Sequence, residues 1–432
     1  MLYVQMEPSE THKYWKSMVA MFPTNRFIEI SILHRNPIMI HLLIFVLNFV
    51  NGWLIFKILR QFRFMANSTK TAIALMFLVL PINSARVAMI NFRYTYSLTL
   101  FLLGWYLLVQ RKYKLLRLLS VLILVSSFIV QSLLAFFVLP CIHLFLNNHL
   151  DKGLSKAKSF VYSSAVFLIA PCYFLLVRLL DPPIASRTEY YTPSVRGTFK
   201  GLFLVVISGI WMIDTLRKSP KLTYVSRKQL ISIGTFLVSV GSFAYITAGN
   251  LSDVSEWMLN FVPRASDWDS RHQLLMGLGL AFVVVGLVGD VKARSKKQVF
   301  LLTVAACVGL NFIFMKSYYV DWRKSEGFIT AMSEYRESPD LDRVMIIDTP
   351  SATRFNARGR VVRSYEWEAM LSLALRRKQI HVVNSEQILC WVPNQVIPQS
   401  IIQVSATADP KKTIFTGDAG IAVMVIAMNP CQ

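Results

Sequence analysis

Charged residues are scarce in this sequence, and acidic residues are the scarcest of them. Of 432 residues, 16% are charged and 54% are hydrophobic, and the mean hydropathy is +0.47. A typical soluble domain carries about 25% charged residues. The deficit argues against a chain of two or three soluble domains and indicates a polytopic membrane protein.

Several catalytic and binding motifs are also missing. The sequence has no glycine-rich phosphate loop, no Cys or His spacing typical of a metal site, and no G-x-S-x-G nucleophile elbow. The sequence therefore gives little support for ATP-driven transport or metallohydrolysis, and we expect no cofactor. The first residues lack the basic start, apolar middle and small-residue exit of a signal peptide, so we expect no cleavage there.

Cysteine is rare as well. Three of the five cysteines, Cys141, Cys172 and Cys307, lie inside apolar segments, where cysteine is usually a small core residue. The other two, Cys390 and Cys431, lie in the polar tail. They can pair if that tail is in an oxidising compartment.

Long apolar runs dominate what the sequence does contain. A helix needs about 17 to 25 apolar residues to cross a bilayer. Runs of this kind occupy residues 37–57, 71–91, 94–110, 118–147, 159–180, 200–216, 229–249, 273–290 and 298–316. We predict an all-α membrane bundle of about ten membrane segments.

The net charge of +22 comes from 46 basic against 24 acidic residues. In a soluble protein such an excess suggests a nucleic-acid partner, but here the cations lie mostly in short loops between apolar runs. Such loops are cytoplasmic in membrane proteins. The excess is therefore mainly a topology signal, and no nucleic-acid partner is expected. The cationic loops contain Lys57 to Lys70, Arg111 to Arg117, Lys152 to Lys158, Arg217 to Lys228, and Lys292 to Lys297.

The run 118–147 must cross the membrane and return, because basic loops flank it on both sides. We predict two short passes or a re-entrant hairpin that turns near Gln131 and Ser132. Pro140 is compatible with a broken helix in this run.

The domain organisation follows from these segments. We predict an outward-facing N-terminal segment at 1–36 with an amphipathic helix from Ser9, a transmembrane domain at 37–316, and a small extracytoplasmic α/β domain at 317–432. Within the last domain, β-type runs occur at 342–350, 378–383, 400–406, 412–417 and 420–428, and helical spacing occurs at 322–338 and 364–378. This domain can be a stability or docking module without chemistry of its own.

Two arginines stand in apolar surroundings at the predicted outer end of the membrane domain. Arg86 and Arg93 lie seven residues apart, which is two turns on one helix face, and Tyr94 follows directly. One interpretation is interfacial anchoring, with the cations in the headgroup layer and tyrosine in an aromatic belt. The other is a partly dry pocket in which guanidinium groups bind the phosphate of a lipid-linked substrate.

A second polar cluster, RASDWDSRHQ, precedes the run 273–290 on the same predicted outer side. Asp267 and Asp269 can supply a general base, Arg271 a phosphate clamp, and His272 a proton carrier. A solvated helix start has the same composition, because Asp and Ser cap helices. In the outer loop SRTEYYTPSVRGTF, Arg196 follows two tyrosines in a mixture suited to sugar rings, although a surface loop would look similar.

These features together resemble the polytopic GT-C class of glycosyltransferases over residues 37–316, at the level of architecture. Residues 91–140, from NFRYTYS to FFVLP, are also similar to bacterial exopolysaccharide polymerase-like proteins, in which an arginine opens a span and a short hairpin follows a basic loop. The resemblance implies a polyprenyl-phosphate-linked sugar donor and transfer at the outer side of the membrane. It also implies an acidic base in the first outer loop, where this chain offers only Glu7, Glu10 and Glu29.

We therefore expect a cell-surface polysaccharide protein of a bacterial inner membrane. In the enzyme hypothesis, Arg86, Arg93 and Arg271 hold the phosphate, assisted by Tyr94, Arg196 and His272, and Asp267 or Asp269 deprotonates the acceptor. Its partners would be a polyprenyl-phosphate-linked glycan, membrane lipids and other polysaccharide-assembly proteins. The alternatives are a flippase or transporter of lipid-linked glycans, a scaffold, and a shortened or inactive relative.

Overall fold

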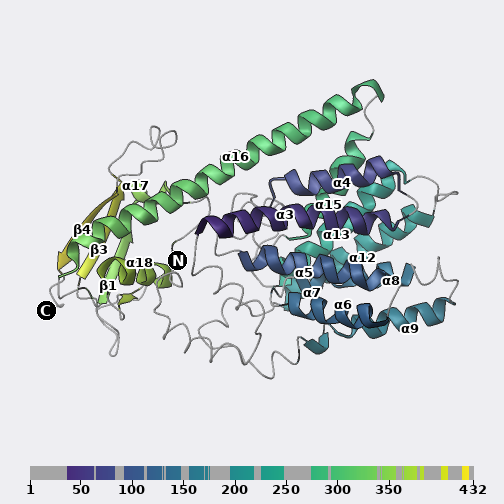
Figure 1. Ribbon diagram of the computed structural model, residues 1–432, viewed down its shortest axis with the longest axis horizontal. Helices are drawn as coiled ribbons and strands as arrows, with labels where there is room; N and C mark the ends of the chain where they lie inside the picture. Colours follow the sequence, from purple (N-terminus) through teal and green to yellow (C-terminus); the bar gives the residue numbers. More distant parts are fainter. Residues whose placement is uncertain are drawn as a thin grey trace. The chain divides into compact units, whose positions relative to one another are not determined.

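The computed structural model divides the chain into two compact units, one within residues 37–311 and one from 312 onward (Figure 1). It describes residues 37–62, 65–82, 92–110, 114–128, 130, 133–146, 155–169, 171–173, 175, 195–217, 225–247, 274–289, 293–337, 341, 343–356, 362, 364–376, 380–383, 400–406 and 421–427.

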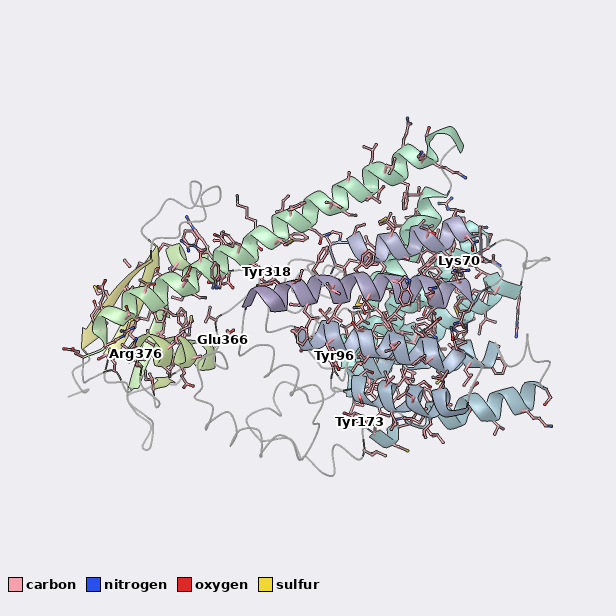
Figure 2. All side chains as sticks on the ribbon, in the orientation of Figure 1. Lys70, Tyr96, Tyr173, Tyr318, Glu366 and Arg376 are labelled. Atoms are coloured by element: carbon pink, nitrogen blue, oxygen red, sulfur yellow. The ribbon has the colours of Figure 1, made fainter. Side chains whose placement is uncertain are left out.

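The first unit is helical, as its apolar runs predict. Among its described residues the helices are α3 (Pro37–Arg60), α4 (Asn67–Val79), α5 (Phe92–Val109), α6 (Lys114–Ser127), α7 (Leu133–Phe136), α8 (Val138–Leu146), α9 (Lys156–Phe167), α12 (Val195–Arg217), α13 (Arg227–Thr247), α15 (Met276–Val288) and the beginning of α16 (Ala293–Met332). Figure 2 shows Lys70, near the start of α4, at the opposite end of this unit from Tyr96, near the start of α5, and from Tyr173. Helices α4 and α5 therefore run in opposite directions along this unit.

Three of the described helices are long and apolar enough to cross a membrane, at His41–Arg60, Val195–Arg217 and Ser295–Tyr335. Shorter apolar helices occupy Tyr94–Val109, Leu118–Ser127, Leu133–Phe145 and Met276–Val288. Protein buries only 11% of an apolar 18-residue stretch of α12 and only 6% of such a stretch of α16. Their apolar side chains are therefore free to face lipid.

The run 118–147 is interrupted in the structure. Helix α6 ends at Ser127, and α7 and α8 follow from Leu133. The predicted turn at Gln131 and Ser132 lies outside the described residues, between the end of α6 and the start of α7. Helix α5 packs against both α6 and α8, and Trp105 Nε1 donates to His143 Nδ1 at 3.1 Å across the α5–α8 interface.

Helices α13 and α15 approach each other at paired glycines. A Cβ atom at Gly234 would lie 2.5 Å from the Gly279 carbonyl oxygen, and one at Gly279 would lie 2.7 Å from the Gly234 carbonyl oxygen. Contacts below about 3 Å to backbone cannot be relieved by a rotamer change. Small residues at such positions let membrane helices pack backbone to backbone.

The second unit contains a four-stranded mixed sheet in the order β2-β1-β3-β4. Its strands are β1 (Arg343–Asp348), β2 (His381–Val383), β3 (Ser400–Ala406) and β4 (Ile421–Ala427). Strand β1 is parallel to both β2 and β3, and β4 is antiparallel to β3. The predicted β-type run 412–417 lies outside the described residues.

One face of the sheet carries the core of this unit. Helices α16 and α18 (Ser364–Leu375) and the short α17 (Pro350–Thr353) contribute to a cluster that contains Phe328, Met332, Ala352, Trp367, Leu371, Val344, Ile402 and Val404. The strand residues in it alternate, as a period of two along each strand requires. The sequence predicted a last membrane run and a separate helix from 322, whereas the structure has the single helix α16 over both.

Candidate functional site

The predicted outer site is described only in part. Arg86, Asp267, Asp269, Arg271 and His272 lie outside the described residues, as do Cys390, Cys431 and the amphipathic helix predicted from Ser9. Their proposed convergence therefore stays a prediction. The described members are Arg93, whose backbone alone is placed, Tyr94 and Arg196.

Arginine occurs in the first turn of two helices, and in one of them tyrosine follows it. Arg93 is the second residue of α5, and Arg196 is the second residue of α12. Arg196 is exposed, whereas Tyr94 is only 6% exposed and lies inside the bundle. The positive end of a helix dipole adds to an arginine in the first turn, so both helix starts favour anions such as phosphate.

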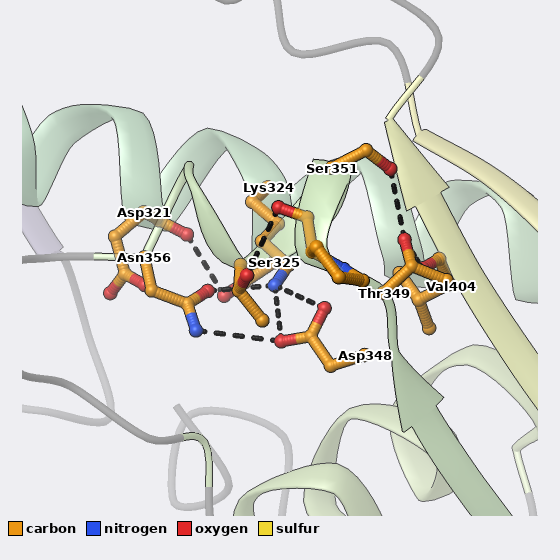
Figure 3. A network of polar contacts seen from close by, with 10 residues as sticks. Asp321, Lys324, Ser325, Asp348, Thr349, Ser351, Asn356 and Val404 are labelled. Atoms are coloured by element: carbon orange, nitrogen blue, oxygen red, sulfur yellow. Dashed lines mark hydrogen bonds and ion pairs between the residues drawn. The ribbon is translucent and has the colours of Figure 1, made fainter.

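A second polar group of residues lies in the C-terminal unit, and the sequence prediction did not single it out. Lys324 on α16 is 2% exposed and donates from Nζ to Asp348 Oδ1 at 2.7 Å, to Asp348 Oδ2 at 2.6 Å, and to Asn356 Oδ1 at 2.7 Å (Figure 3). Asn356 Nδ2 completes the arrangement by donating to Asp348 Oδ2 at 3.4 Å. The three residues come from a helix, a strand end and a loop, and we call them the Lys324 network.

Hydroxyl groups lie beside this network. Thr349 Oγ1 donates to the Val404 carbonyl oxygen at 2.8 Å and lies 2.9 Å from Ser351 Oγ, while Ser325 Oγ donates to the Asp321 carbonyl oxygen at 3.1 Å. Figure 3 shows these groups together around the end of β1. Thr349 thereby ties the residue after β1 to the adjacent strand β3.

The network occupies a defined position in the sheet. Asp348 is the last residue of β1 and pairs with Val404 of the parallel strand β3. After β1 the chain continues through α17 and α18 to β2, which lies on one side of β1. The next strand, β3, lies on the other side of β1. In open α/β sheets, ligands bind at the carboxyl ends of strands where the chain diverges in this way.

Burial acts on the ammonium group of Lys324. Lys324 lies beyond the apolar run that ends at residue 316, by about 12 Å of helix rise. Desolvation lowers the pKa of Lys324, and the charge and hydrogen bond of Asp348 raise it in part. With three acceptor oxygens around it, Lys324 is satisfied as a structural cation.

All three ammonium protons of Lys324 have an acceptor within the network. The network is therefore better suited to holding α16 against β1 than to group transfer. The signal in the sequence was weak, because an acid at the end of an apolar strand and a lysine after Trp322 are common separately. Only the fold brings them together. Among the described residues, no group of His, Cys, Asp and Glu is placed to hold a metal ion.

Comparison with known proteins gives no further assignment: no family model, no curated protein and no solved structure matches this chain.

Proposed function

We propose that this chain is a multi-pass membrane protein of cell-surface polysaccharide synthesis that transfers or polymerises sugars carried on a polyprenyl phosphate at the outer membrane face. The observation that supports it best is the placement of Arg93 and Arg196 in the first turns of α5 and α12. Both helices run away from the end at which the sequence predicts the outer side, and both end close to cationic loops.

In this proposal the arginines bind the lipid phosphate and stabilise the negative charge that grows on it as the bond to the sugar breaks. Asp267 or Asp269, directly before α15, accepts the proton of the attacking hydroxyl. By the same alternation, α15 also starts at the outer end. Arg86, Arg271 and His272 complete the phosphate site, and about ten membrane segments frame it.

The test is a set of single substitutions expressed in a bacterial strain that lacks this protein. We expect Arg93→Ala, Arg196→Ala and Asp267→Ala each to abolish surface polysaccharide while protein abundance in the membrane stays unchanged. Lys228→Ala is the matched control, because Lys228 is an exposed cation in the first turn of α13 at the opposite, cytoplasmic end. Normal polysaccharide in all three variants would refute the site.

Transport of a lipid-linked glycan is a second candidate, and one observation favours it. Asn51 lies in α3 with no exposed surface, and neither atom of its side-chain amide has a hydrogen-bond partner among the described residues. A buried unpaired amide costs about 1 to 3 kcal/mol, and a polar path through the bundle would need polar groups of this kind within the spans.

The two functions differ in the side on which an intermediate accumulates. In an inactive transferase variant the lipid-linked sugar collects on the outer leaflet, where periodate oxidises it in intact cells. In an inactive transporter variant it collects on the inner leaflet and is oxidised only after the membrane is opened. Applying this to Arg196→Ala and to Asn51→Leu separates the proposals.

A further inference from the structure

Helix α16 exposes a stripe of large side chains where its apolar run ends. Phe312, Met315, Tyr319 and Trp322 are 68%, 50%, 49% and 40% exposed, respectively. Their spacing of three, four and three residues places them on one helix face. We call these four residues the juxtamembrane stripe. It changes along the helix from purely apolar to amphipathic aromatic side chains.

Such a change is typical of the boundary between hydrocarbon and headgroups. Tyrosine and tryptophan concentrate at this level because each ring has an apolar body and a polar edge. The rings of Tyr319 and Trp322 lie 5.7 Å apart, so they form one aromatic surface. Cationic side chains occur at the same level, on Lys316 and on the half-exposed Arg323, and cations there attract anionic lipids.

The opposite face of the same helix stretch holds the C-terminal unit. Asp321 and Lys324 are 3% and 2% exposed, and Phe328 lies in the core on the sheet. The Lys324 network begins two residues after Trp322, which is about 3 Å along the helix axis. The carboxyl end of β1 is therefore fixed to α16 at the level of the aromatic pair.

The segment after β1 continues this surface. Asn356 contacts Lys324, and two residues before it Arg354 is exposed. Arg323 and Arg354 thus present cations near the same end of the sheet, although Arg323 also pairs with Glu326 at 2.7 Å.

We infer that the C-terminal unit rests on the membrane through the carboxyl end of its sheet, with the juxtamembrane stripe marking the boundary and Arg354 in contact with anionic lipid headgroups. Two observations carry this inference: Trp322 at the end of the stripe lies at the level of the Lys324 network on α16, and the stripe and the network lie on opposite faces of the helix. It requires that α16 crosses a membrane, but it does not depend on the glycan chemistry proposed above.

Spin labels on single cysteines measure how deep chosen residues lie in the membrane, in the full-length protein. The five native cysteines are replaced by alanine, and labels are placed by Val308→Cys, Trp322→Cys, Arg354→Cys and Glu334→Cys in vesicles of phosphatidylcholine and phosphatidylglycerol. Val308 lies within the apolar run, and Glu334 is exposed about 18 Å beyond Trp322. Collision with oxygen reports the hydrocarbon, and collision with a water-soluble nickel chelate reports the aqueous phase.

We expect Val308→Cys to collide with oxygen, Glu334→Cys with the nickel chelate, and Trp322→Cys and Arg354→Cys to give intermediate values at headgroup depth. Omitting phosphatidylglycerol should shift Arg354→Cys, but not Glu334→Cys, toward the aqueous value. If Trp322→Cys and Arg354→Cys match Glu334→Cys, the sheet does not rest on the membrane. If Val308→Cys is aqueous, α16 does not cross it, and the inference fails independently of any result on polysaccharide.

Discussion

At the scale of single residues, Lys324 is a buried cation with an acceptor oxygen for each of its three ammonium protons. A lysine with 2% exposure has lost its water, and the two oxygens of Asp348 with the amide oxygen of Asn356 replace it. A buried pair of this kind adds little net stability over apolar residues of the same size, yet it is costly to break from one side. The pair therefore fixes which part of α16 meets β1.

This asymmetry gives a prediction for single and double substitutions. Lys324→Met should destabilise the C-terminal unit by about 3 to 5 kcal/mol, because Asp348 stays charged and loses its cation. Adding Asp348→Leu should recover most of that loss, because no charge is then left buried. The measurement is protease resistance of the C-terminal unit in the full-length protein in detergent micelles, as a function of denaturant.

Arg323→Ala is the matched control for this prediction. Its partner Glu326 is 44% exposed at the side chain, and such surface pairs contribute at most about 1 kcal/mol. Equal loss of protease resistance in Arg323→Ala and Lys324→Met, or no recovery in the double variant, would contradict the role given to the Lys324 network.

At the scale of elements, α13 packs on α15 with backbone against backbone. Gly279→Ala would place a methyl group within 2.7 to 2.9 Å of Gly234 O, Val238 N and Leu237 Cβ. Two of these atoms are backbone, so the helices must separate, at a cost of about 1 to 3 kcal/mol for an overpacked interface. We expect a lower Tm in detergent and lower abundance in the membrane.

Gly277→Ala, two residues away on the same helix, is the control for this substitution. A Cβ there meets only the ring of Phe77, at 3.5 and 3.6 Å, which is ordinary van der Waals contact. Its Tm should equal or exceed that of the unsubstituted protein, because alanine favours helix over glycine by about 1 kcal/mol. Similar losses in both variants would mean that backbone contact does not set this interface.

Elements also show what the sequence predicted and what it did not. Apolar length predicted the helices, and loop charge predicted the break between α6 and α7, because 118–147 had to return to the same side. Short β-type runs at 342–350, 378–383, 400–406 and 420–428 predicted the four strands β1, β2, β3 and β4. The continuity of α16 was not predicted, since a change from apolar to polar composition at residue 317 does not end a helix when tertiary contacts continue it.

The Lys324 network could not be predicted for a related reason. Lys324, Asp348 and Asn356 are separated by 24 and 8 residues along the chain, and each has an ordinary local context. Their meeting depends on the strand order and on the face of α16 that covers the sheet. Arg93 was found from the sequence because a charged group in apolar surroundings is unusual on its own. Arg196 was found because it follows two tyrosines in a predicted outer loop.

At the scale of the whole molecule, the positions of the positive charges and the helix directions together predict which helix ends face the cytoplasm. Short loops rich in lysine and arginine stay in the cytoplasm. If the helices alternate as the loop charges predict, Val195 at the start of α12 and Lys228 at the start of α13 lie on opposite sides of the membrane. Both side chains are exposed, so a reagent can reach each of them.

Cysteine labelling in intact cells tests this orientation. In a variant whose native cysteines are replaced by alanine, Val195→Cys should react with a membrane-impermeant maleimide added outside, and Lys228→Cys should react only after the membrane is opened. The two positions lie at the starts of consecutive antiparallel helices, so each serves as the control for the other. Labelling of Lys228→Cys alone in intact cells would invert the topology, place Arg93 and Arg196 on the cytoplasmic side, and remove the basis for an outward lipid-phosphate site.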